Sequence, residues 1–120
     1  IMLNKIGFIS YTVTNLQQSI NFYQNLLGLK LLLSNDLWAE FDILGQRFTI
    51  HKKKSNERNQ HKNGAIVYFE VSQIEAIVKN LKNKGVKFCG EIEVFSYGKL
   101  VLFLDPDNNS IGLYELPLKD

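Results

Sequence analysis

The sequence contains one cysteine, two prolines and one tryptophan among its 120 residues, and no long apolar run. Because Cys89 stands alone, it excludes a disulfide within the chain. No run of about 18 apolar residues and no charged-then-apolar leader is present, so neither a membrane span nor secretion is predicted. We therefore expect a cytoplasmic protein that does not bind membranes.

The sequence also lacks a large excess of one charge sign. It has 14 Lys and Arg and 12 Asp and Glu, which gives a net charge of +2. The basic residues are spread along the chain and do not gather on one periodic face, which does not favour nucleic-acid binding. The densest group, Lys52 to Lys54, continues to Asn63 without one apolar residue. We interpret that polar stretch as a solvated loop.

What the sequence does contain is an ordinary globular composition, with 45% hydrophobic and 22% charged residues. A chain of this length fits a single domain, here 1–120. It buries roughly two-thirds of its unfolded surface, so its stability does not depend on a metal or a cross-link.

The first half of the chain follows a strand and helix pattern. The alternation from Ile9 to Val13 predicts a strand, and Thr14 or Asn15 then caps a helix with Gln17 or Gln18 placed to complete a capping box. Gly28 ends that helix after about three turns. Three further strands are predicted at 29–33, 38–44 and 47–53, the last two joined by a tight turn at Gly45.

The second half repeats this order. Val67 to Val71 alternate as a strand, Ser72 to Glu75 form an S-x-x-E capping box, and Gly85 ends the next helix. Strands are predicted at 86–94, 99–104 and 110–116. The two helix starts are offset by 74 − 16 = 58 residues and the two glycine stops by 85 − 28 = 57. This indicates an internal duplication of βαβββ modules at about 1–58 and 64–120.

Each module places its helix against one sheet face, so function is expected on the other face. Strand periodicity names that open face, because alternate side chains point away from the helix. Its members are Phe8, Ser10, Thr12, Thr49, His51, Ile66, Tyr68, Glu70, Gly112 and Tyr114.

Two segments resemble the signatures of a known superfamily. Asn21 to Leu29 (NFYQNLLGL) is similar to the pattern F-Y-x-x-x-L-G, and Leu104 to Glu115 (LDPDNNSIGLYE) is similar to D-P-D-G-N-x-I-x-L-x-E. Both patterns belong to the vicinal oxygen chelate superfamily of glyoxalases, bleomycin-resistance proteins, fosfomycin-resistance enzymes and extradiol dioxygenases. The resemblance implies an α+β fold of two βαβββ modules whose sheets curl into an open cleft, usually within a homodimer.

The segment from Asp105 to Ser110 also has a local interpretation. Asp105 and Asp107 could be taken for paired carboxylates or calcium ligands, but Pro106 fixes one dihedral and Asp and Asn bond their own backbone. We therefore predict a structural turn.

The resemblance also implies where a metal would be held, because metal-dependent members bind a divalent ion with His, Glu or Gln from four strands. Aligned on the signatures, those positions are Phe8, Thr49, Ile66 and Gly112. Three of these side chains have no donor atom, and a lone threonine hydroxyl is a poor ligand. We expect no metal centre of the family type and no other cofactor.

Three polar residues are candidates for chemistry. His51 is suited to act as a general base or as a hydrogen-bond donor, or it is a partly exposed histidine at a strand end. Glu40 and Glu70 form either an acid/base set or an altered metal site with His51, or they are solvated carboxylates. His61 lies in the polar loop and is assigned no role.

The open face also carries aromatic side chains. They form either the walls of an apolar pocket or part of a core or dimer interface. Phe95 and Tyr97 lie in the strand and loop before the predicted strand 99–104 and could add to such a wall. The residues expected to contact a ligand are Phe8, Ser10, Trp38, Thr49, His51, Tyr68 and Tyr114.

These observations favour a metal-independent protein that binds a small aromatic or apolar molecule. Bleomycin itself is disfavoured, because a cationic drug requires an acidic groove and this chain is net basic. The alternative is a lyase, isomerase or dioxygenase-like enzyme that uses His51 as a base or a relocated metal at His51, Glu40 and Glu70. A third possibility is a structural role, with the cleft filled by its own side chains.

Overall fold

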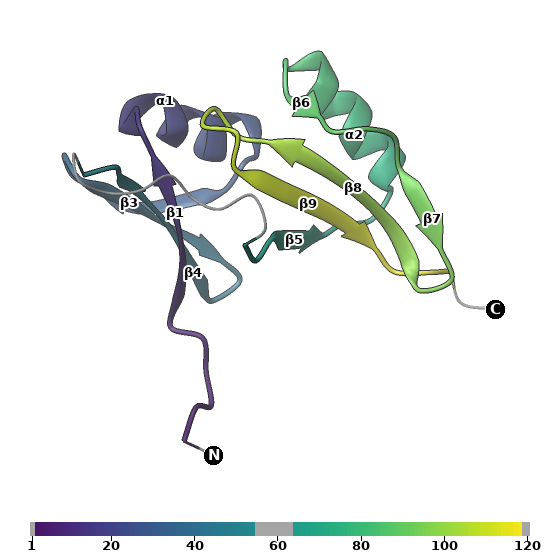
Figure 1. Ribbon diagram of the computed structural model, residues 1–120, viewed down its shortest axis with the longest axis horizontal. Coiled ribbons are helices and arrows are strands. Elements are labelled where there is room, and N and C mark those ends of the chain that lie inside the picture. Colours follow the sequence, from purple (N-terminus) through teal and green to yellow (C-terminus); the bar gives the residue numbers. More distant parts are fainter. Residues whose placement is uncertain (1, 55–63, 119–120) are drawn as a thin grey trace. The chain divides into compact units, whose positions relative to one another are not determined.

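The computed structural model describes residues 2–54 and 64–118. The chain divides into two compact units, Ile1–Gln60 and His61–Asp120. Each unit has one sheet with helical structure against one of its faces (Figure 1). Residues 55–63 of the predicted polar loop, including His61, lie outside the described residues.

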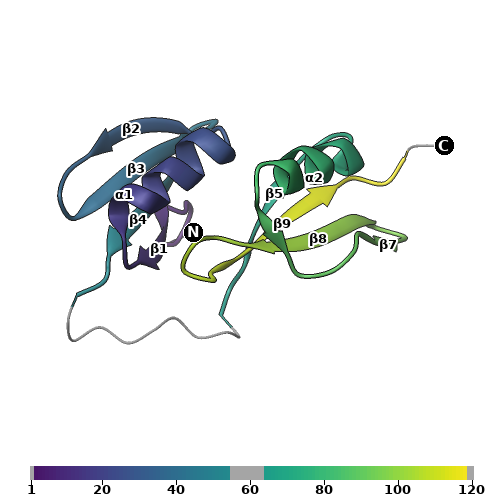
Figure 2. The same ribbon diagram turned by 90° about the horizontal axis from the view of Figure 1, so that it is seen from above.

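The first unit has the predicted element order. Its elements are β1 (Phe8–Val13), α1 (Leu16–Asn21), a π-helical segment η1 (Phe22–Leu26), β2 (Lys30–Ser34), β3 (Trp38–Ile43) and β4 (Gln46–Lys52). The sheet order is β1-β4-β3-β2, in which β1 runs parallel to β4 and the other pairs are antiparallel. Figure 2 shows α1 lying across β3 and β4, and it contacts both strands.

An aromatic cluster forms the core between this helix and its sheet. Tyr23, Phe41 and Phe48 are fully buried. The ring centroids of Tyr23 lie 5.9 Å from Phe41 and 5.3 Å from Phe48, and Tyr11 lies edge-on to Phe48 at 5.4 Å. Tilted and edge-to-face contacts at these separations are favourable for aromatic rings. The cluster therefore fixes the face of β3 and β4 that lies opposite the open face.

The first helix begins as predicted but does not stay regular. The Asn15 side chain caps it by accepting a hydrogen bond from the Gln18 backbone N–H at 3.0 Å. After Asn21 the turns widen, and the Leu27 N–H donates to the Phe22 carbonyl at 3.0 Å. Phe22 and its neighbour Tyr23 are both buried along this wider turn. Periodicity could not predict it, because a π turn is favoured by packing and has no strong local signal.

The turn between β3 and β4 contains a strained residue. Leu44 has a φ of 48° and is fully exposed, and Gly45 follows with a φ of 91°. Two successive positive φ angles match the hairpin turn that favours Asn-Gly. Leucine gains no contact here that would offset its conformational cost.

Replacing Leu44 by asparagine should therefore raise the free energy of unfolding by about 0.5–1 kcal/mol, because asparagine tolerates a positive φ better than leucine. Urea denaturation followed by tryptophan fluorescence measures the change. Leu37→Asn is the control, because Leu37 is also exposed but has no positive φ. Equal effects of the two substitutions would show that lost surface hydrophobicity, not backbone strain, is responsible.

The second unit has one more strand than predicted. Its elements are β5 (Val67–Glu70), α2 (Ile74–Asn83), β6 (Lys87–Phe88), β7 (Glu93–Phe95), β8 (Gly98–Leu104) and β9 (Ser110–Glu115). The sheet order is β5-β9-β8-β6, and β7 also pairs with β8. The predicted continuous strand 86–94 is wrong, because Gly90, with a φ of 133°, lies in a break that divides it.

The second predicted capping box is also wrong. Gln73, with a φ of 57°, is the N-cap of α2 and makes no side-chain capping bond. The Ile74 N–H donates instead to Glu115 Oε1 at 2.6 Å, a partner supplied by β9. Glu75 accepts a hydrogen bond from Lys99 Nζ at 2.6 Å, which lowers the pKa of Glu75 and raises the pKa of Lys99. A distant carboxylate thus replaces the local cap.

The turn predicted between β8 and β9 is confirmed. Asp105 is buried, and its Oδ1 accepts backbone hydrogen bonds from Asp107 at 2.9 Å and Asn109 at 2.8 Å. Its Oδ2 accepts from Asn109 Nδ2 at 2.9 Å. Asn108 has a φ of 64° at the position where the superfamily signature has glycine. The carboxylate of Asp105 is therefore a turn-forming group.

The mixed α+β fold predicted from the sequence is confirmed, with two sheets and few helices. Among residues 2–54 and 64–118, no helix is long and apolar enough to cross a membrane.

Candidate functional site

The open face of the first sheet carries a grid of nine side chains, because β1, β4 and β3 pair in register. The three rows across these strands are Phe8–Arg47–Asp42, Ser10–Thr49–Glu40 and Thr12–His51–Trp38. Alternate residues of the same strands, including Ala39, Phe48 and Ile50, are buried on the helix side. Strand periodicity therefore separates the two faces as predicted.

A hollow of about 430 Å³ lies on this grid. Its lining residues are Phe8, Ser10, Trp38, Glu40, Arg47, Thr49 and His51. Thr49 occupies the centre of the grid, is 7% exposed, and donates a hydrogen bond from Oγ1 to the Ile9 carbonyl at 3.3 Å. The hollow therefore has a fixed, uncharged floor.

His51 lies between two hydroxyl groups. Its Nδ1 is 2.8 Å from Ser10 Oγ and its Nε2 is 3.1 Å from Thr12 Oγ1. A neutral imidazole has one N–H donor and one acceptor nitrogen, whereas a hydroxyl serves as either. The two contacts hold the ring plane while still allowing either tautomer. His51 is thus a positioned side chain, as a base or a ligand-contacting group requires.

Glu40 and Arg47 form the charged side of the hollow. Arg47 Nη2 lies 3.6 Å from Glu40 Oε2, and the two side chains are 56% and 18% exposed. The separation is that of an ion pair and is longer than a hydrogen bond. Asp42, next along β3, accepts the Gly45 N–H at 3.0 Å and belongs to the turn.

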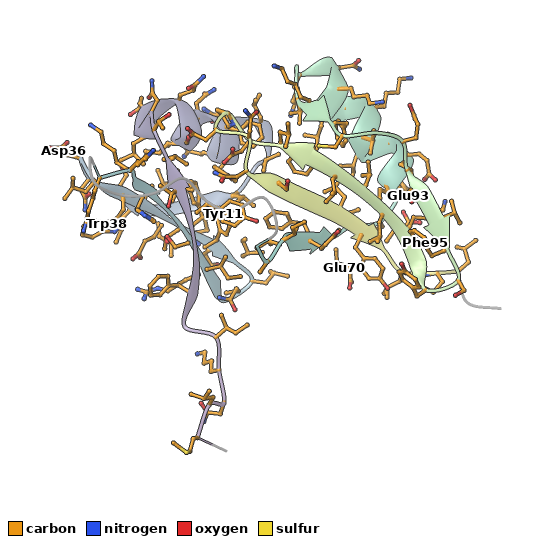
Figure 3. All side chains as sticks on the ribbon, viewed as in Figure 1. Tyr11, Asp36, Trp38, Glu70, Glu93 and Phe95 are labelled. Carbon is orange, nitrogen blue, oxygen red and sulfur yellow. The ribbon has the colours of Figure 1, made fainter. Side chains whose placement is uncertain are left out.

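Two aromatic side chains stand at opposite corners of the grid. Phe8 is 59% exposed and Trp38 is 40% exposed. Trp38 lies next to the bend after β2, close to Asp36 in Figure 3. The Asn35 side chain orders that bend by accepting hydrogen bonds from the N–H groups of Leu37 and Trp38 at 2.8 and 2.9 Å.

The other predicted ligand contacts, Tyr68 and Tyr114, lie in the second unit and do not line this hollow. The Tyr68 ring packs on Gly112, where an added Cβ would lie 2.2 Å from a ring carbon. Tyr114 covers Gly98 in a similar way, and its hydroxyl donates to the Tyr97 carbonyl at 2.8 Å. These tyrosines shield glycines in the sheet.

Phe95 and Tyr97, also in the second unit, stack on each other with ring centroids 5.0 Å apart. Neither lines the hollow of the first unit.

A family profile matches this architecture and most of the chain. The profile of the glyoxalase/bleomycin resistance protein/dioxygenase superfamily covers residues 5–113. The chain belongs to this superfamily. The two signatures, near Phe22 and near Asp105, are therefore those of the glyoxalase superfamily. In this chain the first lies in the first helical region and the second forms the β8–β9 turn.

Sequence alignments with relatives cover nearly the whole chain. Metallothiol transferase FosB of Staphylococcus saprophyticus is 27% identical over 123 residues, covering 99% of this chain and 82% of that protein. YetH of Bacillus subtilis is 26% identical over 121 residues, covering 95% of this chain and 100% of that protein.

Solved structures share the fold. A glyoxalase family protein from Enterococcus faecalis has a TM-score of 0.80 at 22% identity, covering 96% of this chain and 100% of that one. Lactoylglutathione lyase from Agrobacterium tumefaciens has a TM-score of 0.76 at 14% identity, with 94% of each chain covered. Because identities are this low, the structural likeness shows the fold alone.

The four positions implied for a superfamily metal do not fit a divalent ion. The side chains of Phe8, Ile66 and Gly112 offer no donor, and the Thr49 hydroxyl is engaged with the Ile9 carbonyl. The Tyr68 ring fills the space into which a side chain at position 112 would project. Within the described part of the chain, no group of three or more His, Cys, Asp and Glu side chains is placed to hold a metal.

The relocated-metal alternative gains no support from the geometry. His51 and Glu40 share the hollow, but Glu70 belongs to β5 of the other unit (Figure 3). Both ring nitrogens of His51 already lie within hydrogen-bond distance of hydroxyls. The structure thus brings together two of the three candidates.

Arg47 is the site residue that sequence reasoning missed. It alternates with Thr49 and His51 along β4, so the periodicity that named those two residues also placed Arg47 on the open face. Long basic side chains at strand ends are usually solvated, so residue type alone gives no signal for Arg47.

Proposed function

We propose that this protein binds a small planar organic molecule in the hollow of the first unit, without a resident divalent metal. One observation carries the proposal: two exposed aromatic rings, Phe8 and Trp38, stand at opposite corners of a hollow whose floor and sides are polar and positioned. Apolar walls with a few fixed polar groups are typical of sites for small organic ligands.

The physical basis is burial of a flat ring between aromatic walls. Aromatic contacts contribute about 0.5–1.5 kcal/mol each beyond the apolar area they remove from water. Ser10, Thr49 and His51 supply hydrogen-bonding groups that fix orientation. A cytoplasmic location, a homodimer, the absence of a nucleic-acid partner, and ligand contacts from Tyr68 and Tyr114 stay predictions.

The second candidate function is metal-free catalysis with His51 as a general base. It is favoured by the 2.8 Å contact between His51 Nδ1 and Ser10 Oγ, and by a relative named as a metallothiol transferase. That name implies a metal, which the residues of this chain do not fit. Turnover of a bound compound that is lost in His51→Ala would establish this function.

The binding proposal is tested with the single tryptophan of the chain, because Trp38 borders the hollow. Titration with 2-naphthol, quinoline and 2-quinolinone should give saturable quenching for at least one compound, at one molecule per chain. The dissociation constant should be unchanged in EDTA, because no metal takes part. Fluorescence and calorimetry together give the affinity and stoichiometry.

Two results would contradict the proposal. One is the absence of saturable binding for every compound. The other is binding that EDTA abolishes, together with elemental analysis showing a stoichiometric divalent ion that His51→Ala loses. Phe95→Ala is the control, since this exposed ring lies in the second unit and should leave binding unchanged.

A further inference from the structure

One carboxylate oxygen in the hollow lacks a hydrogen bond. Among the described residues, the fully buried side-chain polar atoms without a hydrogen-bond partner are Ser19 Oγ and Glu40 Oε2. Ser19 is on α1, whereas Glu40 lines the hollow. Buried acceptors are nearly always hydrogen-bonded, because an unsatisfied one loses its hydration without compensation. The Glu40 carboxylate, which lines the hollow, therefore has an unsatisfied acceptor oxygen that a small rotation of the group would turn toward a ligand.

Arg47 balances the charge of Glu40 but does not satisfy this oxygen. Its Nη2 lies 3.6 Å from Oε2, outside hydrogen-bond range, and more than half of its side chain is exposed. The guanidinium therefore has donors left for a second acceptor. One side of the hollow thus presents an acceptor and a donor next to each other, with no net charge.

This arrangement restricts the ligand. A simple anion would be repelled by Glu40, and a simple cation would be repelled by Arg47. A neutral group with a donor beside an acceptor meets both residues at once. Lactams and primary carboxamides have this pattern, with an N–H and a carbonyl on one edge, and they are planar.

We propose that the bound molecule is a planar lactam or aromatic carboxamide, recognised by hydrogen bonds to the N–H and carbonyl of its amide group. Its N–H donates to Glu40 Oε2, and its carbonyl accepts from the Arg47 guanidinium. The ring lies over Thr49, between the Phe8 and Trp38 corners of the grid. This inference rests on the proposed binding function and makes Glu40 the residue that determines specificity.

A matched ligand pair tests it. 2-Quinolinone has the N–H, whereas N-methyl-2-quinolinone keeps the ring and carbonyl but has no donor. The protein should bind 2-quinolinone at least about tenfold more tightly, as expected for a hydrogen bond to a charged group. Calorimetry and Trp38 fluorescence provide both dissociation constants.

Variants assign the preference to one residue. In Glu40→Met, which is similar in size but has no acceptor, the preference should fall to about one. Glu40→Gln keeps an acceptor oxygen and should retain part of the preference. Asp42→Asn is the matched control on the same strand and face, and it should leave the preference intact. Circular dichroism and thermal unfolding verify that each variant folds.

The outcomes separate the two proposals. Equal binding of both quinolinones, or a preference that persists in Glu40→Met, overturns the amide-edge inference and leaves the binding function standing. Failure of all compounds to bind saturably overturns the binding function and the inference with it. A tenfold preference that depends on Glu40 supports both.

Discussion

Replacing Phe48 by alanine should lower the free energy of unfolding of the first unit by about 3–5 kcal/mol, the range for removing a buried aromatic side chain. Phe48 is fully buried and contacts the rings of Tyr11, Tyr23 and Phe41. It lies on β4 between Arg47 and Thr49, so the same strand holds the core on one face and the hollow on the other. Urea denaturation followed by Trp38 fluorescence measures the loss.

Phe8→Ala is the matched control, because it makes the same chemical change at a side chain that is 59% exposed. It should alter the free energy of unfolding by less than about 1 kcal/mol. It should instead weaken the binding of a planar ligand by roughly three- to tenfold, the equivalent of one aromatic contact. If Phe8→Ala destabilises the protein as much as Phe48→Ala, Phe8 belongs to the core and the proposed ligand wall is lost.

Replacing Asp105 by alanine should lower the free energy of unfolding by about 3 kcal/mol, because three hydrogen bonds to a buried carboxylate are lost and their donors are left unsatisfied. These donors are the backbone N–H groups of Asp107 and Asn109 and the side-chain amide of Asn109. Thermal and urea unfolding followed by circular dichroism would measure the loss.

Two further variants at this turn make the result specific. Asp105→Asn keeps two acceptor contacts but points an amide at the Asn109 amide, so it should lose about half as much stability. Asp107→Ala should have the smallest effect, because the Asp107 side chain accepts none of these three bonds. If Asp105→Ala proved harmless to folding, the aspartate would need another role, such as ligand binding.

This chain shares its fold with metal-dependent relatives but does not have side chains that fit the metal. The alignment with a metallothiol transferase relative covers 99% of this chain. The positions implied for a metal nevertheless hold phenylalanine, threonine, isoleucine and glycine. The scaffold is kept, with its helix-ending and turn signatures. Because function is carried by a few side chains on a shared fold, membership alone does not assign metal chemistry here.

Local sequence patterns predicted most of the helices and strands, and the physical reason can be given for each pattern. Alternation along β1 reflects burial of one face, and the positive φ angles of Gly28 and Gly85 end the two helical regions as expected. The S-x-x-E motif failed as a cap because Glu75 pairs with Lys99 and Glu115 supplies the cap from another strand. Such long-range partners leave no mark in a local window.

By itself the sequence determined the α+β class, the superfamily and the face of the first sheet on which Phe8, Ser10, Thr49 and His51 lie, while the internal duplication stays a prediction. These follow from periodicity, caps and turn residues, which act between neighbours in the chain. Only the tertiary structure decided that Glu40 and Arg47 face each other in a hollow and that Tyr68 covers Gly112. The reason is physical: strand register sets which side chains meet, and that register depends on the packing of the whole unit.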